Sequence, residues 1–208
     1  MLIKTTVRYI RDFSIVVAGI AVTLYVNYRI TNQGEKRDIN LYLNAIQLEM
    51  EENIKTLDKA IEYIKPSVRY SQYLQTHDKE SLDNDTIKSY LSVFYSSQSF
   101  TFKTNAFEMF KSSGVMRLMN DKELLLTIWD VYAELSDVKE LLDWGDQIKT
   151  NDLIKEASGA IVVKDRGPVL STENAPMYSF YIIGIPENML NGCEEVMPKL
   201  KHLVEKLR

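Results

Sequence analysis

The sequence is poor in the residues that carry most protein chemistry. Its 208 residues include one cysteine, Cys193, and two histidines, His77 and His202. A single cysteine excludes an internal disulfide and any cysteine-based metal site. The two histidines lie far apart in sequence beside charged residues, so we interpret both as solvated surface side chains. No H-E-x-x-H or paired Glu-x-x-His sequence occurs, and we therefore predict no metal and no cofactor.

Recognisable catalytic motifs are missing as well. The chain has no G-x-S-x-G, Walker A or G-x-G-x-x-G sequence. The serine pair Ser112–Ser113 before Gly114 has no histidine nearby in sequence, and ordinary helix-end capping accounts for it. The short acidic run Glu49, Glu51 and Glu52 is interpreted as a solvated helix face rather than a cation site. We predict no catalytic, cofactor-binding or metal-binding residue, and expect a protein that is not an enzyme.

Glycine and proline are scarce, with 8 and 5 residues, and the sequence has no excess of positive charge. Leucine, isoleucine, glutamate and lysine are plentiful, which favours helices. The 25 Lys and Arg residues against 29 Asp and Glu give a net charge of −4. Nucleic-acid binders usually carry a basic patch or stripe. We therefore predict a mainly α protein with no nucleic-acid partner.

One segment lacks charge altogether. Residues 13–28, between Arg11 and Arg29, contain no charged side chain and are largely aliphatic. A helix of that length is about 24 Å long, slightly short of a hydrocarbon core of about 30 Å, but flanking arginines can extend to the interface. We predict a transmembrane helix over residues 13–29 after a basic tail, residues 1–12. A cleaved signal peptide and a core helix of a soluble domain are weaker alternatives, because no small-residue cleavage site follows the run and the run has no polar face.

The sequence constrains the orientation of this span in the membrane and its possible partner helices less strongly. Basic residues on both sides favour a cytoplasmic N-terminus only slightly. We expect a single-pass protein of the bacterial inner membrane with its body in the periplasm. Small residues in the span allow two membrane helices to approach closely, so a homo-oligomer is an alternative to ordinary span composition. These residues are Ser14, Ala18 and Ala21, with Gly19 and Thr23 beside them.

After the span we expect a polar joint over residues 30–38, with Gly34 as its flexible point, and then a helical domain over residues 39–208. Apolar residues recur there with a mean spacing close to 3.6, which predicts an amphipathic helix: Ile39, Leu43, Ile46, Met50, Ile54, Leu57, Ile61 and Ile64. The solvated face is expected to carry Glu49, Glu52, Lys55, Lys59 and Glu62. Pro66 is expected to kink or end this helix.

Capping residues predict shorter helices in the middle of the chain. Asp83 or Asp85 suits the start of a helix over residues 87–94. A loop over residues 96–103 follows. Asn105 with Glu108 has the spacing of a capping box, and Gly114 is a natural left-handed stop for the helix that they open.

The remaining helices are predicted from similar signals. Asn120 with Glu123 starts a long helix that runs to Trp144 or beyond. Residues 159–186 contain two β-branched and aromatic runs that form either a hairpin or apolar loop and helix pieces. A last helix follows, with Pro198 as a break or second start.

Together these patterns predict an N-terminal transmembrane helix followed by an antiparallel bundle of four to six helices, with a possible short β-hairpin near the C-terminus. The first long helix is expected to pack antiparallel to the helix that begins at Asn120. Aromatic residues are dense between Tyr90 and Trp129, among them Phe94. Most are expected in the core, and a pocket or partner groove is the alternative.

Two stretches together resemble a known family. They are the apolar run ending in "LYVNYR" (24–29) with the long charged helix after it, and "FKTNAFEMFKSSGVMRLMND" (102–121). They resemble an uncharacterised family of bacterial membrane-anchored proteins, a domain of unknown function frequent in bacteroidetes, over residues 13–142. That family has a motif like F-x-T-x-A-F-E-x-x-x-S-S-G, matched by Phe102, Thr104, Ala106, Phe107, Glu108, Ser112, Ser113 and Gly114. Tyr28 stands where the family usually has Trp after Asn27. The resemblance implies an inner-membrane protein and assigns no catalytic residue.

Three hypotheses for function follow. The first is a non-enzymatic scaffold of the cell envelope, a single-span anchor whose helical domain binds another protein or forms a homo-oligomer. The second is an extracytoplasmic sensor that binds a small molecule and acts through a membrane partner. The third is an enzyme with an unrecognised site. A filled core with an exposed apolar stripe favours the scaffold, an apolar cavity with a buried charge the sensor, and a buried carboxylate–histidine pair the enzyme.

Overall fold

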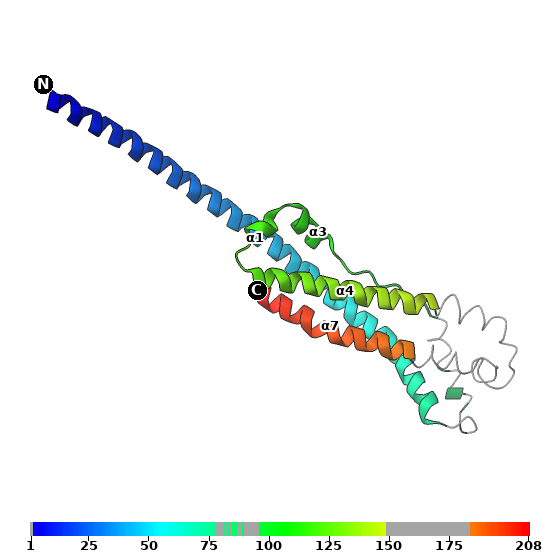
Figure 1. Cartoon of the computed structure of the whole chain (residues 1–208). Helices are drawn as coiled ribbons and strands as arrows, with labels where there is room; N and C mark the ends of the chain where they lie inside the picture. The colour runs from blue at the N-terminus through cyan, green and yellow to red at the C-terminus, as the bar shows by residue number, and fades with distance from the viewer. Residues whose placement is uncertain are drawn as a thin grey trace.

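The computed structural model describes residues 2–77, 81, 83, 85–86, 89, 96–148 and 184–208, without the side chains of residues 2–13, 15 and 74. This part of the chain is mainly α-helical, as predicted (Figure 1). Most of the segment 159–186, where a hairpin was one alternative, and most of the helix predicted over 87–94 lie outside the described residues. At the edge of the latter, the Thr86 N–H donates to Asp83 Oδ2 at 2.8 Å, so of the two predicted caps Asp83 is the one that acts.

The first helix is longer than predicted. α1 (Leu2–Thr76) has 75 residues, so it includes the N-terminal tail, the uncharged run and the polar joint in one element. The prediction of a joint at residues 30–38 is therefore wrong as a break in structure. Glu35, Lys36 and Arg37 are good helix formers, and Gly34 costs only about 1 kcal/mol in a helix. Pro66 lies inside α1, which continues to Thr76, so Pro66 does not end the helix.

Three long helices form the bundle. α4 (Lys122–Ile148) and α7 (Ile185–Leu207) pack with the C-terminal half of α1, and the short α3 (Asn105–Ser112) and 3₁₀ helix η2 (Val115–Leu118) cover one end of it (Figure 1). α4 extends past Trp144, as predicted. α7 continues through Pro198, so the predicted break there is wrong.

The helix directions correct one further prediction. α7 runs antiparallel to α1 and α4, but α4 runs parallel to α1 (Figure 1). Tyr132 of α4 contacts Glu49, and Ser97 contacts Asp146 of α4 while its neighbour Ser96 accepts a hydrogen bond from Tyr63. Both helices thus advance in the same direction. The chain returns along α1 through residues 96–104 before α4 begins, which is why the antiparallel prediction is right for α7 and wrong for α4.

The core has the periodicity that the sequence indicates. In α1 the buried residues on the predicted face include Ile46, Met50, Leu57 and Ile64, and the other members of the predicted set pack partly buried against them. α7 contributes one continuous buried face: Ile185, Met189, Cys193, Val196, Met197, Leu200, Leu203 and Val204.

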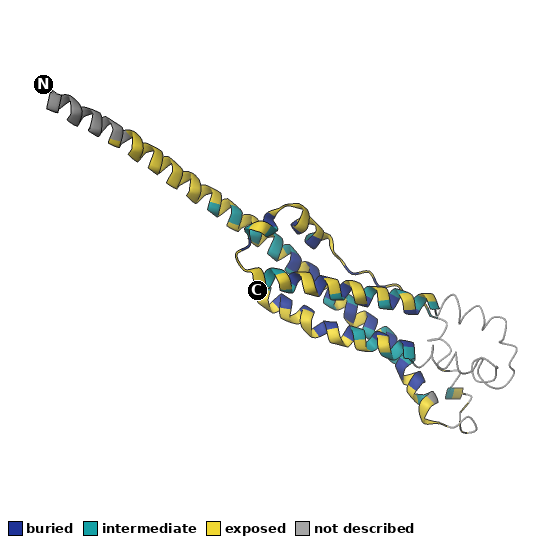
Figure 2. Ribbon diagram, viewed as in Figure 1, coloured by how far each residue is buried: buried dark blue, intermediate teal, exposed yellow. Residues whose placement is uncertain are grey.

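The N-terminal part of α1 extends away from the bundle. Figure 2 shows residues 16–31 exposed on every side of the helix. Among the helices that the structure describes, none has a stretch long and apolar enough to cross a membrane. Residues 13–29 are helical, as predicted, and the membrane crossing of that segment stays a prediction.

Candidate functional site

The first candidate interaction surface is the exposed apolar segment of α1, between Val16 and Ile30. Its large apolar side chains are exposed although they follow one another in sequence: Val16, Val17, Ile20, Val22, Leu24, Tyr25, Val26, Tyr28 and Ile30. They surround the helix rather than forming one stripe, because they are nearly consecutive. A helix that is apolar all round is expected inside a large core or a membrane. The alternative of a core helix of a soluble domain does not fit this placement, since the segment lies outside the bundle.

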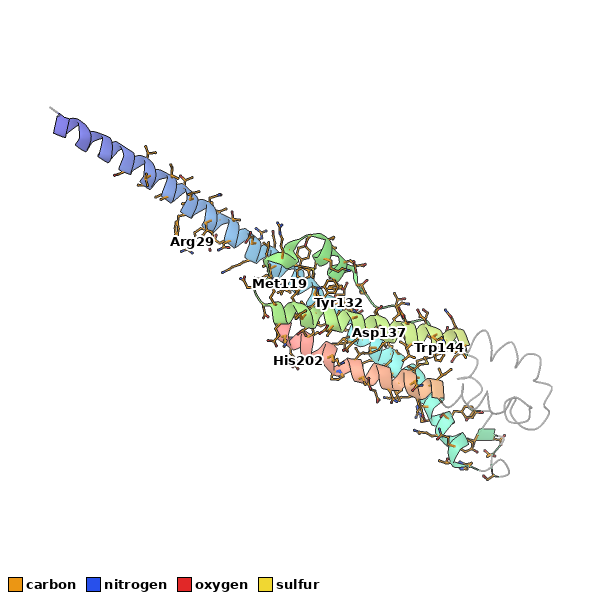
Figure 3. The ribbon with its side chains drawn as sticks, viewed as in Figure 1. Arg29, Met119, Tyr132, Asp137, Trp144 and His202 are labelled. Carbon is orange, nitrogen blue, oxygen red and sulfur yellow. The ribbon has the colours of Figure 1, made fainter. Side chains whose placement is uncertain are left out.

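The segment ends in a cation packed on an aromatic ring. Arg29, which is labelled in Figure 3, lies four residues and so about one helical turn after Tyr25. The Arg29 Nε–H donates to Tyr25 Oη at 3.0 Å, and the Arg29 guanidinium carbon lies 5.5 Å from the centroid of the Tyr25 ring. Tyrosine, with its amphipathic ring, and arginine, with its long apolar stem, are both well suited to a membrane–water interface.

A buried polar cluster links α1, α3 and α4. The Glu49 carboxylate accepts hydrogen bonds from the Ala106 N–H at 2.8 Å and from the Tyr132 hydroxyl (Figure 3). Glu49 is buried, so its predicted place on a solvated face is wrong. The carboxylate thus accepts a hydrogen bond from a backbone N–H in the first turn of α3, which has no acceptor within its own helix. The helix dipole also favours a negative charge at this position. Burial and the Glu49 hydrogen bond raise the pKa of Tyr132, which keeps its hydroxyl a donor.

Asn53 forms the second half of this cluster. Its side-chain amide donates to the Lys103 carbonyl at 2.8 Å and accepts from the Lys103 N–H at 2.7 Å. Asn53 is fully buried and lies one turn after Glu49. The two side chains together fix the 96–104 segment and the start of α3 against α1. Their role is explained by backbone groups that need partners, so the cluster is a structural one.

The F-x-T-x-A-F-E-x-x-x-S-S-G residues pack around this cluster. The Phe107 ring stacks on Tyr132 with centroids 4.1 Å apart and meets Trp129 edge-on at 5.2 Å. Phe107 and Phe110 are buried, as predicted, whereas Trp129 is 43% exposed. Lys111 Nζ lies 5.2 Å from the centroid of Phe107. These contacts give the motif a packing role.

Backbone geometry at the ends of α3 and α4 refines the predicted caps. Gly114 has φ +74° and ends α3, as predicted. Asn105 forms no capping box with Glu108, because Thr104 occupies the cap position without a side-chain hydrogen bond and Glu49 supplies the acceptor instead. At the start of α4 the Leu124 N–H donates to Asp121 Oδ1 at 2.8 Å. The predicted cap Asn120 is therefore off by one residue.

The serine and histidine candidates behave as surface and capping residues. Ser113 Oγ donates to the Phe110 carbonyl at 2.8 Å and accepts from the Val115 N–H at 3.2 Å, which is helix-end chemistry. Ser112 Oγ likewise donates to a carbonyl of its own helix. His77 and His202 are both exposed, as predicted (His202 in Figure 3).

The described residues offer little to a small ligand or a metal ion. Glu52 and Glu62 are paired with Lys55 and Lys65 on the surface, and these lysines lower the pKa of both carboxyls. No group of three or more potential metal ligands gathers within the described part of the chain. An open groove of about 410 Å³ lies between α4 and α7, lined by Thr127, Asp130, Val131, Glu134, Pro198, Lys199 and His202. Of the predicted pocket aromatics, Tyr90 and Phe94 lie outside the described residues.

Comparison with known proteins leaves the family open. No protein-family model, no curated protein and no solved structure matches this chain. The resemblance to the bacterial membrane-anchored family stays a prediction. The buried roles of Glu49 and Asn53 were missed in the sequence, and the only available signal was that both lie within about 60° of the apolar face of their helix.

Proposed function

We propose that this protein is a membrane-anchored helical scaffold of the bacterial cell envelope, which has no catalytic site and binds a protein partner. α1 carries the anchor, and the bundle formed with α4 and α7 is the body that it holds near the membrane. The body lies on the periplasmic side of the inner membrane. The observation that carries this proposal is the exposed, uncharged run of α1, which protrudes from a body with a filled core.

The free energy of hydration supports a lipid environment for that run. Burying one large apolar side chain is worth about 1.5–3 kcal/mol relative to leaving it in water. The segment exposes many such side chains at once, and no part of the described bundle covers them. Lipid tails surround a helix on every side, which suits an apolar surface that has no polar face.

The proposal requires the ends of the run to extend it, because the run alone is shorter than a hydrocarbon core of about 30 Å. Residues 13–28 give about 24 Å of helix, and Ile30 continues the apolar surface beyond Arg29. Arg29 has an aliphatic stem and can extend its guanidinium toward the headgroups. A span shorter than the hydrocarbon core is accommodated by local thinning of the bilayer, at a fraction of a kcal/mol per Å.

The proposal is tested first by membrane attachment. The full-length protein is expressed and its membranes are floated and washed at alkaline pH. We expect it to remain with the membranes at full length, and the variant Val22→Glu to be released, because a carboxylate near the middle of the span costs about 2.5–3.5 kcal/mol. Lys36→Glu is the matched control, since it adds a carboxylate to the same helix outside the run.

Direction is tested with reporters fused after Arg208. One reporter is active only outside the cytoplasm and the other only inside. We expect the outside reporter to be active. A protein found in the soluble fraction at full length would overturn the anchor, and an active inside reporter would overturn the periplasmic placement while leaving the anchor intact.

A further inference from the structure

The described elements leave one face of α1 largely exposed both inside and outside the bundle, with only Ala45 half-buried on it. Its residues recur at steps of three and four: Gly19, Thr23, Val26, Ile30, Gly34, Arg37, Leu41, Ala45 and Leu48. At 100° per residue they stay on one side of the helix, opposite the core-facing Ile46 and Leu57. Leu41 and Leu48 are 65% and 63% exposed, although α1 is packed in the bundle on its other side. We call these nine residues the α1 stripe.

The α1 stripe has an eleven-residue period. Position by position the repeat reads Gly19–Ile30–Leu41, Thr23–Gly34–Ala45 and Val26–Arg37–Leu48. Eleven residues make just over three helical turns, so the stripe follows the helix axis with little drift, as in right-handed or nearly straight helix pairs. The second series contains only small residues. A Cβ added at Gly19 or Gly34 would meet no atom of this chain within 4 Å, so another backbone can approach there.

The stripe has a definite end. One turn beyond Leu48 the same face carries Glu52, and then Lys55 and Lys59. Glu52 and Lys55 form an exposed ion pair at 2.8 Å. The apolar character is therefore confined to the stretch between the uncharged run and the middle of the bundle, about 44 Å of helix from Gly19 to Leu48.

The stretch of α1 between the uncharged run and the bundle gives a second reason for a partner. Thr31, Asn32, Gly34 and Asp38 are poor helix formers, yet α1 is continuous through them without support from the bundle. Most helices in proteins draw their stability from packing of a face rather than from intrinsic propensity. Gly34 and its stripe neighbours Ile30 and Arg37 provide such a face.

We propose that the α1 stripe is the contact surface of a parallel homodimer, in which a second copy of this chain packs its own stripe against it. This deepens the proposed function, on which it rests, by naming the partner. Two copies anchored in one bilayer with the same orientation bring identical stripes into register. Such a contact has the two-fold symmetry of the commonest protein dimers. In the parallel pair Arg37 of each copy lies beside Asp38 of the other, which matches opposite charges.

The position of the bundle around α1 determines which face of α1 can form the dimer contact. Ser14 and Ala21 lie within about 40° of the core-facing Ile46, on the side where α7 and α3 pack. Close contact through those small residues would direct the two bundles into each other. Contact through Gly19 and Thr23 places the two bundles on the outside of the pair.

The test is cysteine cross-linking of the full-length protein in membranes. Cys193 is fully buried, so it is kept in every sample as a constant background. Leu41→Cys and Leu48→Cys place a thiol on the stripe. Lys36→Cys and Asn40→Cys place one on exposed positions of the same helix, about 80–140° away from Leu41 and Leu48. After mild oxidation we expect at least ten-fold more disulfide-linked dimer from the stripe positions than from the two controls.

A substitution test follows in nanodiscs, where single-particle mass gives the fraction of dimer. We expect Leu41→Glu to lower that fraction strongly and Asn40→Glu to leave it unchanged. Equal cross-linking at stripe and control positions, or a wild-type protein that is monomeric in nanodiscs, overturns the dimer.

Flotation of the same samples separates the two proposals. A protein that floats with membranes but shows no stripe-specific cross-link loses the dimer and keeps the anchor. A stripe-specific cross-link in a protein that does not float keeps the dimer and overturns the anchor.

Discussion

At the scale of the residue, Asn53 connects the return segment of the chain to α1. Its amide pairs with both backbone groups of Lys103, at 2.8 and 2.7 Å, and it is fully buried. Few other side chains can supply both a donor and an acceptor in that geometry. Together with Glu49 and the Tyr63–Ser96 hydrogen bond, this amide holds the 96–104 segment, and hence α3, against α1.

We predict that Asn53→Ala destabilises the protein by about 2–4 kcal/mol, because two backbone groups lose their partners and each costs about 1–3 kcal/mol when left unmade. Asn53→Asp keeps an acceptor for the Lys103 N–H but places a second carboxylate one turn from Glu49, so it is also destabilising. Denaturant unfolding of the full-length protein in detergent measures both.

The matched control is Asn44→Ala, an exposed asparagine on the same helix. We expect a change within about 0.5 kcal/mol for it. An equal effect of the two alanine substitutions would show that the Lys103 pairing contributes nothing measurable.

The burial of Cys193 leads us to predict that the protein loses stability at alkaline pH. Burial, with a smaller contribution from Glu194, raises the pKa of its thiol from 9.0 to about 12. The unfolded chain therefore releases this proton between about pH 9 and 12 while the folded chain keeps it, so stability is full below pH 9 and falls as the pH rises. Tyr70, whose pKa burial raises to about 12, adds to the fall above about pH 10.

We expect the denaturation midpoint to drop between pH 8 and pH 10 in the wild-type protein and to drop less in Cys193→Ala. The comparison uses the slope with pH rather than absolute stability, since removing the thiol also leaves a small cavity. Parallel slopes in the two proteins would rule out the thiol as the titrating group.

At the scale of the element, Gly114 sets the turn between α3 and η2. Its φ of +74° is a left-handed conformation, and a Cβ there meets no atom within 4 Å. The need for glycine is thus one of backbone conformation alone. We predict that Gly114→Ala costs about 1–2 kcal/mol and that Gly114→Asn costs less, because asparagine tolerates this region better than alanine. Thermal unfolding of the two variants checks the order, and an alanine variant as stable as wild type would contradict it.

The elements that the sequence predicts well are those fixed by local pattern. The spacing of Ile46, Met50, Leu57 and Ile64 predicted the buried face of α1, and Gly114 predicted the end of α3. Both signals are carried by residues within a few turns of each other. They need no knowledge of what packs against them.

The elements that were predicted wrongly depend on distant contacts. Glu49 was expected in solvent because nothing near it in sequence indicates Tyr132 or the Ala106 N–H as its partners. The direction of α4 depends on the path that the chain takes before Lys122. The spacing of apolar residues and the helix caps carry no information about that path. Gly34 was expected to be the flexible point of a joint and Pro66 to kink or end α1. The helix continues through both residues, because propensity is a weak guide where the rest of the helix is strongly favoured.

At the scale of the whole molecule, the exposed N-terminal part of α1 and the bundle are separable parts of the chain. The first side chains of α1 that pack against the core are Ile39, Tyr42 and Leu43. None of the described side chains between Ser14 and Arg29 belongs to that core. We predict that a chain shortened to residues 30–208 folds with the helical circular dichroism of the bundle and no longer floats with membranes.

The measurement for that prediction compares the shortened chain with the full-length protein in flotation and in unfolding. An unfolded or aggregated product would show that the N-terminal part of α1 is needed for the bundle. The proposed dimer makes a further expectation here, because the shortened chain keeps Leu41 and Leu48 but loses Gly19 and Thr23. Its self-association is expected to be weaker than that of the full-length protein.

Because α1 is continuous, a change in the inclination of its N-terminal part also displaces the bundle. No hinge separates Arg29 from Ile64, which are about 52 Å apart along the helix axis. A change of 10° in the inclination of the helix at its base therefore moves the level of Ile64 sideways by about 9 Å. Under the proposed anchoring, a change in the tilt of the membrane span is in this way coupled to the position of every surface on the bundle.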